Sequence, residues 1–424
     1  MDWGLCLGCG LCKYASTSGT VELVNIEATG IRPLFDAEAL SASVRLLDIC
    51  PGYSIDAATA TGAMRNPTAA DREYGPALEI WEGYAADPEL RHRGSSGGVL
   101  SALALWCLER EDMAFVLHAG MDPEKPWLNK NFTSRTRADL LARAGSRYAP
   151  ASPCDDLEKI ENSDRPCVFI GKPCDTAGVF AVRGERPILD QRLGAVLTFF
   201  CAGTPSTRGT LALLEQMQIR RDAVEQLRYR GEGWPGGFTV TGNKGTMRDF
   251  MPYQQAWGAL TPHIPLRCRL CPDGLGRVAD ISCGDAWEQF DEAHPNPGMS
   301  IVLVRTQRGR EILRGAVADG YVNLVTGSSD AVFLAQPHLL SKRQELFGRL
   351  LALRLLLIPI PRFRGFSQFH SWIRLPILRK LRTLTGTLWR AVRRGWWKRR
   401  HYPQFQRILA KNLFVAPPSH RSKA

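Results

Sequence analysis

The sequence predicts an α/β protein (α+β overall) with a small cysteine-rich module at its N-terminus and a basic helical tail. Apolar segments with the composition of strands alternate with helical segments between residues 114 and 200. This alternation is typical of a parallel sheet covered by helices. Three cysteines lie in the first twelve residues, and Lys and Arg side chains collect near the C-terminus. We expect regions 1–60, 75–335 and 341–424, with a polar linker at Ala57–Pro76.

Composition narrows the class of protein. A chain of 424 residues with 44% hydrophobic and 23% charged residues can bury large cores and is not disordered. Its twelve cysteines are too sparse for a disulfide scaffold, and their clustering indicates metal ligation in a reducing compartment. Because the first cysteine cluster begins close to Met1, we expect no secretory signal and a cytoplasmic protein.

The N-terminal cysteines Cys6, Cys9 and Cys12 form a CxxCxxC run. Thiolates at this spacing converge when a loop wraps around a metal centre, and Gly8 and Gly10 permit the tight turns that such a loop needs. Bacterial ferredoxins continue the run with a fourth cysteine that ligates a second cluster. That cysteine is missing here, so the run predicts one cluster whose last ligand comes from elsewhere in the chain.

Cys50 is the candidate for the missing ligand, because a helix predicted at Asp36–Leu47 delivers it and Pro51 follows it. A short strand predicted at Thr20–Ile26 precedes this helix. Three close cysteines and a distant Cys-Pro pair predict one [4Fe-4S] cluster in a ferredoxin-like module. A zinc knuckle is the alternative, although zinc sites prefer paired CxxC or Cys/His spacings.

A Ser/Gly-rich loop, RGSSGG at residues 93–98, opens a predicted helix at Val99–Leu108. Such a loop presents free N–H groups and the positive end of the helix dipole to an anion. Gly97 and Gly98 would let a phosphate approach the backbone closely. Taken alone, the loop favours an ordinary helix cap over an anion site.

The segments that follow predict the α/β core. Strands are predicted at Ala114–Ala119, Asn129–Thr133, Cys167–Ile170, Gly194–Phe200, Ala279–Asp285, Val302–Arg305 and Tyr321–Val325, a hairpin at Phe238–Thr246, and helices at Thr136–Ala144, Thr176–Val182 and Gly309–Ala318. Ligands of parallel sheets bind just past the carboxyl ends of the strands. Lys172, Cys174 and Cys201 stand at such ends, and Cys268 and Cys271 form a CxxC further along.

Eight motifs occur together and in a fixed order: CxxCxxC, RGSSGG, GSRYAP, GKPCD, CAG after a strand, YRGEGWP, CRLCPD and ADISCGD. In this combination the chain resembles the coenzyme F420 hydrogenase/dehydrogenase beta-subunit family, which includes plant 7-hydroxymethyl chlorophyll reductase. The resemblance covers roughly residues 1–330, and the tail lies outside it.

The resemblance implies an iron–sulfur flavoprotein whose α/β domain binds FAD. The FAD pyrophosphate would lie near Ser95, Ser96, Gly97 and Gly98, with Tyr148 and Lys172 near the flavin. A second [4Fe-4S] cluster would draw on Cys174, Cys201, Cys268 and Cys271. The positions of these cysteines, at two strand ends and in a CxxC, agree with an all-thiolate cage.

Several of these assignments keep an alternative. The CxxC pair also fits a zinc clip, and Cys154 and Cys283 are substitutes if one of the four predicted ligands fails. Lys172 is the predicted catalytic residue, because its charge would stabilise an anionic reduced flavin; a lysine in a turn is the alternative. His118 is a candidate proton donor, but the interpretation as an ordinary core histidine is favoured.

These features predict an oxidoreductase that passes electrons from a ferredoxin-type donor through two [4Fe-4S] clusters and FAD to a small organic substrate. F420 or an envelope or polysaccharide precursor would be such a substrate. The alternative is an electron-transfer subunit that relays electrons to a partner enzyme and has no substrate of its own. A non-redox scaffold that acts through its tail is a third hypothesis.

The tail from residue 341 onward carries the basicity of the chain. It holds 20 of the 54 Lys and Arg residues and one of the 42 acidic residues, so its net charge is +19 and that of the rest is −7. Its Arg residues alternate with Leu, Ile and Trp, including Trp389, Trp396 and Trp397. This pattern predicts a peripheral segment on the anionic inner face of the membrane, ahead of a partner protein and well ahead of nucleic acid.

Overall fold

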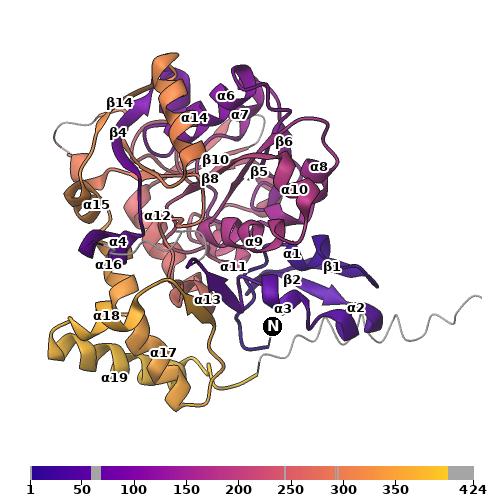
Figure 1. Cartoon of the computed structure of the whole chain (residues 1–424), viewed down its shortest axis with the longest axis vertical. Coiled ribbons are helices and arrows are strands. Elements are labelled where there is room, and N and C mark those ends of the chain that lie inside the picture. Colours follow the sequence, from indigo (N-terminus) through magenta and orange to yellow (C-terminus); the bar gives the residue numbers. More distant parts are fainter. Residues whose placement is uncertain (1, 59–67, 243–244, 292, 294–295, 400–424) are drawn as a thin grey trace, which may run out of the picture.

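In the computed structural model, residues 2–58, 68–242, 245–291, 293 and 296–399 are described (Figure 1). Residues 59–67 of the predicted linker, residues 243–244 of the predicted hairpin and residues 400–424 of the predicted tail lie outside the described residues.

An eight-stranded mixed sheet forms the centre of the molecule (Figure 1). In spatial order its strands are β14 (Val322–Thr326), β4 (Glu79–Ala85), β13 (Ser300–Val304), β12 (Ile281–Asp285), β8 (Leu193–Phe199), β7 (Cys167–Gly171), β5 (Val116–Met121) and β6 (Asn129–Ser134). The neighbours β12, β8, β7 and β5 are parallel, which confirms the predicted parallel core. The other strands join through antiparallel pairs, so the sheet as a whole is mixed.

Strand β4 has no counterpart among the predicted strands. Glu79, Glu82 and Gly83 interrupt its apolar residues, so its sequence lacks the alternation of a half-buried strand. It forms because β13 and β14 pair with it on both sides. A Cβ atom at Gly83 would collide with the carbonyl oxygen of Asn323 on β14, so glycine permits the close pairing.

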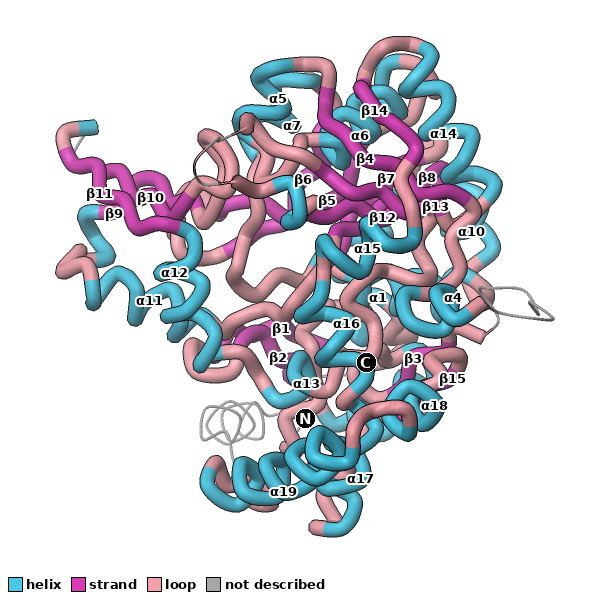
Figure 2. The backbone as a smooth tube through the Cα atoms, turned by 90° about the vertical axis from the view of Figure 1, so that its left-hand side faces the viewer, coloured by secondary structure: helices cyan, strands magenta, loops and turns pink. Residues whose placement is uncertain are grey.

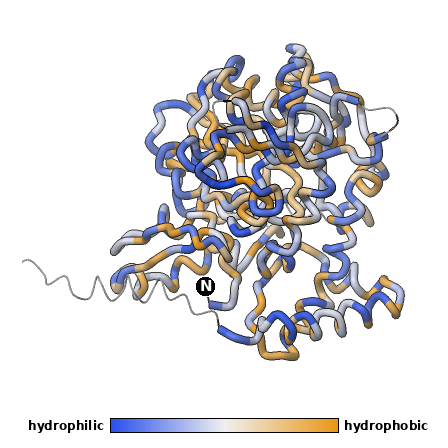
Figure 3. Tube along the Cα trace, turned by 180° about the vertical axis from the view of Figure 1, so that it is seen from behind, coloured by the Kyte–Doolittle hydropathy of each residue, from blue (hydrophilic) through white to orange (hydrophobic). Residues whose placement is uncertain are grey.

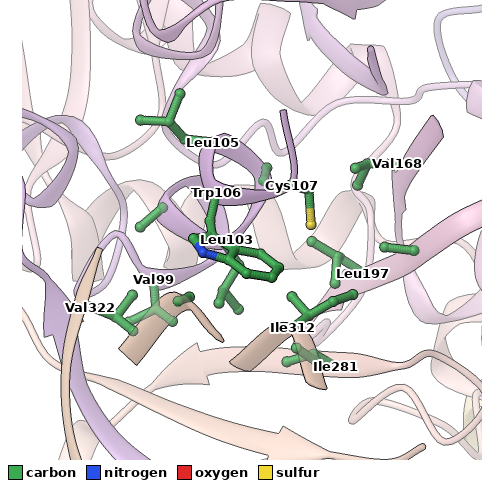
Figure 4. Packing of buried hydrophobic residues seen from close by; sticks show 14 of the residues in the cluster. Val99, Leu103, Leu105, Trp106, Cys107, Val168, Leu197, Ile281, Ile312 and Val322 are labelled. Carbon is green, nitrogen blue, oxygen red and sulfur yellow. The ribbon is translucent and has the colours of Figure 1, made fainter. Parts of the chain in front are cut away.

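Helices cover both faces of the sheet and bury a hydrophobic core on each. One face carries α6 (Val99–Glu109), α7 (Arg137–Arg143) and α14 (Gln307–Ala318), and the other carries α8 (Leu157–Glu161), α9 (Pro173–Arg183) and α10 (Pro187–Arg192). On the first face, Trp106 and Ile312 belong to the same cluster as Leu197 of β8 (Figure 4). Val196, the preceding residue of β8, belongs to the core of the second face. Successive side chains of a strand point in opposite directions.

The N-terminal residues form a small unit against the second face. It contains α1 (Leu11–Tyr14), the hairpin of β1 (Val21–Ile26) and β2 (Gly30–Phe35), α2 (Ala37–Ala42), α3 (Leu46–Ile49) and β3 (Ser54–Asp56). The single helix predicted at Asp36–Leu47 is wrong, since α2 and α3 are separate. The hydroxyls of Ser41 and Ser43 donate to the carbonyls of Glu38 and Leu40, and such local bonds disfavour a continuous helix.

A three-stranded sheet projects from the large sheet, with helices packed on it (Figure 2). Its strands are β9 (Val224–Arg228), β10 (Gly237–Gly242) and β11 (Met247–Pro252), and its helices are α11 (Thr207–Gln216) and α12 (Tyr253–Leu260). The antiparallel pair of β10 and β11 forms a hairpin here, but its second strand lies beyond the predicted range Phe238–Thr246. Short helices elsewhere are α4 (Ala69–Tyr74), α5 (Pro88–Arg93), α13 (Leu266–Arg269) and the 3-10 turns Pro153–Asp156, Arg221–Ala223, Thr261–His263 and Trp287–Gln289.

The C-terminal part is mainly helical where it is described, and its last helices lie at the end of the molecule away from β14 (Figures 1 and 2). Its helices are α15 (Ser329–Ala335), α16 (Pro337–Gln344), α17 (Leu346–Leu355), α18 (Gln368–Ile373) and α19 (Ile377–Arg393). A short strand, β15 (Arg362–Arg364), pairs in parallel with β3, so this part contacts the N-terminal unit. Among the described residues, no helix combines the length and the hydropathy that crossing a bilayer requires.

Leu197 tests the central role of β8. Its side chain is fully buried, so we expect Leu197→Ala to reduce the free energy of unfolding by about 2–5 kcal/mol. Val325 on β14 is largely exposed, and Val325→Ala is the matched control, with an effect of about 0.5 kcal/mol or less. Urea unfolding followed by circular dichroism measures both. Equal losses in the two variants would contradict the placement of β8 at the centre of the core.

Candidate functional site

The loop before α1 brings the first three cysteines together. Gly8 and Gly10 have φ angles of 71° and 91°, the left-handed conformations that the tight turns require. Neither position has room for a side chain, because a Cβ atom would lie 2.5 Å from the carbonyl oxygen of Ile31 at Gly8 and 2.7 Å from the backbone nitrogen of Asp155 at Gly10. The chain therefore follows the tight path that a CxxCxxC run needs around a common centre.

Cys50 joins this group from the end of α3. Burial raises the pKa of the Cys12 thiol, and the neighbouring charges of Cys9, Cys6 and Cys50 raise it further. Burial and the charges of Cys9 and Cys6 likewise raise the pKa of Cys50 to about 11. Charges act on one another in this way when they lie in the same region of the protein. The structure thus brings Cys6, Cys9, Cys12 and Cys50 into one group.

Cys154 lies beside the N-terminal group and not beside the second one. Its backbone N–H donates to the carbonyl oxygen of Cys9 over 3.1 Å. Its buried thiol donates to the carbonyl oxygen of Asp175 over 3.7 Å, and its interaction with the Cys9 side chain lowers the pKa of Cys9. Sequence reasoning treated Cys154 as a substitute ligand for the second cluster, but its contact is with the first group.

The other four predicted cysteine ligands line a second cavity, with about 630 Å³ of empty space including its mouth. These residues are Cys174, Cys201, Cys268 and Cys271. They come from the first turn of α9, the segment after β8, and α13 with the loop behind it. Cys6 of the N-terminal group lines the same cavity, so the two cysteine groups are neighbours.

Two side chains fix the loops that carry these cysteines. The carboxylate of Asp273 accepts from the backbone N–H groups of Leu275, Gly276 and Arg277, which sets the loop after Cys271. The buried guanidinium of Arg267 donates to two carbonyls of the segment that follows Cys50, those of Pro51 (2.6 Å) and Gly52 (3.0 Å). Arg267 therefore ties the second cysteine group to the first.

The donor chemistry of both groups fits an iron–sulfur cluster, since each provides four thiols. Within the described ranges, no three His, Cys, Asp or Glu side chains converge closely enough for one metal ion. A single zinc ion would require all its ligand atoms at about 2.0–2.3 Å from one point, whereas a four-iron cluster offers each thiolate a separate iron.

Lys172 lies at the carboxyl end of β7, between two cavities. Its ammonium group is 2.6 Å from the carboxylate of Asp175 and also donates to the carbonyl of Ala151 over 3.3 Å. Burial disfavours the charged amine, but the carboxylate of Asp175 and the charges of Cys174 and Cys201 outweigh it, so the pKa of Lys172 is raised. Lys172 is therefore a buried cation at neutral pH.

The larger cavity, with about 1650 Å³ of empty space including its mouth, lies above the ends of the parallel strands. Ser95, Ser96, Gly98, Tyr148 and Lys172, which the sequence analysis assigned to FAD, line this cavity. Val99 and Leu100 also line it at the start of α6, where their amides precede the first bond to the carbonyl of Gly98. These amides suit an anion at the helix N-terminus.

The predicted role of Gly97 is not supported by its position. Its N–H donates to the hydroxyl of Ser300 over 2.9 Å, so it is not available to a phosphate. A Cβ atom there would lie 2.6 Å from the carbonyl oxygen of Gly83, so Gly97 permits close packing of the loop on β4. The Ser96 hydroxyl is bound to the protein as well, donating to the carbonyl of Met299 over 2.8 Å.

Sequence reasoning missed an aromatic wall and a buried ion pair in the larger cavity. Arg230 donates two bonds to Asp285, at 2.8 and 2.7 Å, and its guanidinium lies over the rings of Tyr253 and Trp287. These two rings stack with centroids 5.5 Å apart. The signal in the sequence was an aspartate at the end of a predicted strand, but its partner Arg230 lies 55 residues away.

The two cavities share a wall, which is the main feature of the site. Ala151, Lys172, Cys201, Gly203 and Thr204 line both cavities. The predicted cluster ligand Cys201 therefore borders the larger cavity, and Lys172 contributes its charge to both. A group bound in the larger cavity would lie beside the second cysteine group.

Two family models match this chain in the region that provides most of the lining of both cavities. Both describe the beta subunit of "Coenzyme F420 hydrogenase/dehydrogenase": the model of its N-terminal part matches residues 80–158, and the model of its C-terminal part matches residues 164–329. The chain belongs to the coenzyme F420 hydrogenase/dehydrogenase beta-subunit family. The resemblance predicted from the sequence motifs is confirmed.

Individual relatives agree with this family. The chain is 26% identical over 249 residues to the beta subunit of coenzyme F420 hydrogenase from Methanosarcina barkeri, which is 56% of this chain and 77% of that protein. It is 23% identical over 248 residues to the beta subunit of F420-dependent formate dehydrogenase 1 from Methanococcus maripaludis, which is 58% of this chain and 60% of that protein. Both relatives are subunits of oxidoreductases.

A solved structure shows the same fold. A chain of the F420-reducing [NiFe] hydrogenase complex from Methanosarcina barkeri superposes with a TM-score of 0.51 and 22% identity. The match covers 64% of this chain and 92% of that chain. The mixed sheet with helices on both faces is therefore a family fold.

His118 gives a pH dependence that can be tested. Burial, together with the charge of Arg143, lowers its pKa to about 4, so the ring is neutral at pH 7. In the unfolded chain the imidazole binds a proton at about pH 6.5. Stability is therefore lost as the pH falls below 6.5, and this loss is complete near pH 4. Between pH 7.5 and 5, His118 should account for a loss of about 2 kcal/mol.

The variant His118→Gln isolates the contribution of His118 to the pH dependence of stability, because glutamine keeps a partner for the hydroxyl of Ser134 and does not titrate. Urea unfolding at pH 7.5 and 5 should show a smaller acid destabilisation in the variant than in the native chain. An identical loss in both proteins would contradict the neutral, buried state of His118.

Proposed function

We propose that this chain is an electron-transfer subunit that holds two [4Fe-4S] clusters and FAD and serves a partner enzyme in an oxidoreductase complex. The shared wall between the two cavities is the observation that carries this proposal. Lys172 and Cys201 line the larger cavity and also line the cavity of the second cysteine group. A subunit that moves electrons needs its redox groups this close together.

The cysteines divide into two sets of ligands. The first cluster would be held by Cys6, Cys9, Cys12 and Cys50, and the second by Cys174, Cys201, Cys268 and Cys271. When bound, such clusters carry single electrons, and a flavin exchanges either one electron or a pair. We also propose the division of the chain into residues 1–60, 75–335 and 341–424, with the first cluster in the first region.

The residues of the larger cavity have distinct tasks toward FAD. The amides at the start of α6 and the loop of Ser95 and Gly98 would bind the pyrophosphate. Tyr148 packs against Trp257 with centroids 5.0 Å apart and would exclude water from one side of the cavity. Lys172 would hold a positive charge at the shared wall, where it favours added negative charge.

The names of the relatives support a partner enzyme. Both are beta subunits, one of a hydrogenase and one of a formate dehydrogenase, and both names include F420. By analogy we propose that this chain exchanges electrons with another subunit of its own complex. A ferredoxin-type donor at the N-terminal unit is a further proposal, made from the ferredoxin-like cysteine run.

The aromatic wall favours a second candidate function, reduction or oxidation of a small organic substrate such as F420 or an envelope precursor. Tyr253, Trp257 and Trp287 provide aromatic surface in the larger cavity, and the guanidinium of Arg230 lies over two of the rings. Flat ligands stack on such surfaces. A purified chain that oxidises or reduces a substrate without any partner would favour this candidate.

The proposed cofactor content is tested by chemical analysis after anaerobic reconstitution. We expect about eight iron and eight sulfide per chain together with one FAD, as two [4Fe-4S] clusters require. Cys271→Ser and Cys12→Ser should each reduce the iron to about four per chain, because each removes a ligand from a different cluster.

Cys167→Ser is the matched control, since Cys167 belongs to the second-face core and lines neither cavity. It should retain the iron of the native chain. A chain without flavin absorbance, or an iron content that responds equally to all three substitutions, would contradict the proposed function.

A further inference from the structure

Helix α19 is amphipathic, but its apolar side does not face the protein. The residues that it buries are Thr383, Thr387 and Ala391, spaced one turn apart. Gly348 of α17 permits this close contact, since a Cβ atom there would lie 2.5 Å from the hydroxyl of Thr383. The indole of Trp372 donates to the same hydroxyl over 3.2 Å. The inner face of α19 is thus made of small and hydroxylated side chains.

The opposite face of α19 is apolar and open. Its exposed members are Ile377, Leu378, Leu381, Trp389 and Val392, which are between 50% and 78% exposed. Leu384 and Leu388 lie on the same side of the helix, by the 3.6-residue repeat, and are half-buried. A helix of a globular protein normally turns its apolar stripe toward the core. No described residue covers this stripe, which we call the α19 apolar face.

Basic side chains border the α19 apolar face. Arg382 and Arg393 are exposed along one side of it, and the guanidinium of Arg393 lies 4.8 Å from the ring centroid of Trp389. Beyond the helix, exposed Trp397 contacts the ammonium of Lys398, 5.0 Å away. Figure 3 shows hydrophobic and hydrophilic residues alternating along the tail helices. The surface therefore combines aliphatic, indole and cationic groups.

We infer that the α19 apolar face docks the protein on an anionic membrane surface. Aliphatic side chains would enter the acyl boundary, Trp389 and Trp397 would lie at the level of the headgroups, and the arginines would pair with lipid phosphates. Charge complementarity selects this occupant, because the tail is strongly basic and the inner leaflet is anionic. Nucleic acid would use the arginines and leave Ile377, Leu378 and Leu381 exposed.

The arrangement of the molecule agrees with this docking mode. Helix α19 lies at one end of the molecule, and the large sheet lies away from it (Figures 1 and 2). Helix α19 would therefore lie flat in the interface, with α17 on its other side. This inference is independent of the proposed electron-transfer function, because it uses no residue of either cavity.

Vesicle flotation of the full-length chain tests the inference. The probes are vesicles of phosphatidylglycerol mixed with phosphatidylcholine, and vesicles of phosphatidylcholine alone. We expect binding to the anionic vesicles, with at least roughly tenfold weaker binding to the neutral ones. Leu378→Gln/Leu381→Gln should weaken binding at least roughly tenfold through lost apolar contact. Arg382→Gln/Arg393→Gln should weaken it about 30-fold, at about fivefold for each charge.

Val325→Gln/Leu334→Gln is the matched control, since these two residues are as exposed as the leucines and lie on β14 and α15. It should bind like the native chain, and circular dichroism should show all variants folded. Failure of the native chain to float, or equal flotation with both lipids, would overturn the inference. A dimer that the leucine variant dissociates would assign the face to a second copy. Flotation that occurs only after deletion of residues 400–424 would assign the α19 apolar face to that segment of the chain and overturn the inference.

Discussion

The ion pair between Lys172 and Asp175 joins the fold to the candidate site. Asp175 accepts from the backbone N–H of Lys172 over 2.9 Å and from its ammonium over 2.6 Å, so it fixes the turn from β7 into α9. Asp175 is fully buried and the Lys172 side chain is 11% exposed, and removing one partner of a buried pair costs about 3–5 kcal/mol. Cys174 lies inside this turn and takes its position from it. The pair therefore connects the sheet to the second cysteine group.

The same pair interacts electrostatically with cysteines on both sides of the site. Asp175 and Lys172 both act on Cys9 and Cys154 of the N-terminal side and on Cys174, and Lys172 also acts on Cys201. The loops around them are held by the bonds of Arg267 to the segment after Cys50. Two cysteine groups that are far apart in the sequence thus share one buried electrostatic environment, and the larger cavity opens on its other side.

Local patterns in the sequence were sufficient for much of this structure. The cysteine spacing, the glycines at Gly8 and Gly10 and the strand that ends before Lys172 are short-range signals, and the structure agrees with each. Long-range contacts were not predictable in this way. Strand β4 depends on partners in β13 and β14, and the contact of Cys154 with Cys9 depends on how the N-terminal unit packs.

The direction of α19 illustrates the same limit. Its sequence shows an amphipathic, basic helix, but only the packing against Gly348 of α17 determines that the apolar side faces outward. Likewise, Gly97 has the sequence context of a phosphate loop, yet its amide is bound by Ser300. In both cases a residue from another segment decides between two uses of one local pattern.

The charge of Lys172 is tested most directly by a spectroelectrochemical titration of the FAD-loaded chain. Lys172→Gln removes the cation and leaves Asp175 without its partner, so the reduced, anionic flavin loses stabilisation. The flavin midpoint potential should fall by at least about 30 mV, equivalent to a tenfold change in a two-electron equilibrium. Lys125→Gln, on an exposed loop, should leave the potential unchanged. The same potential in all three proteins would contradict a role for Lys172 beside the flavin.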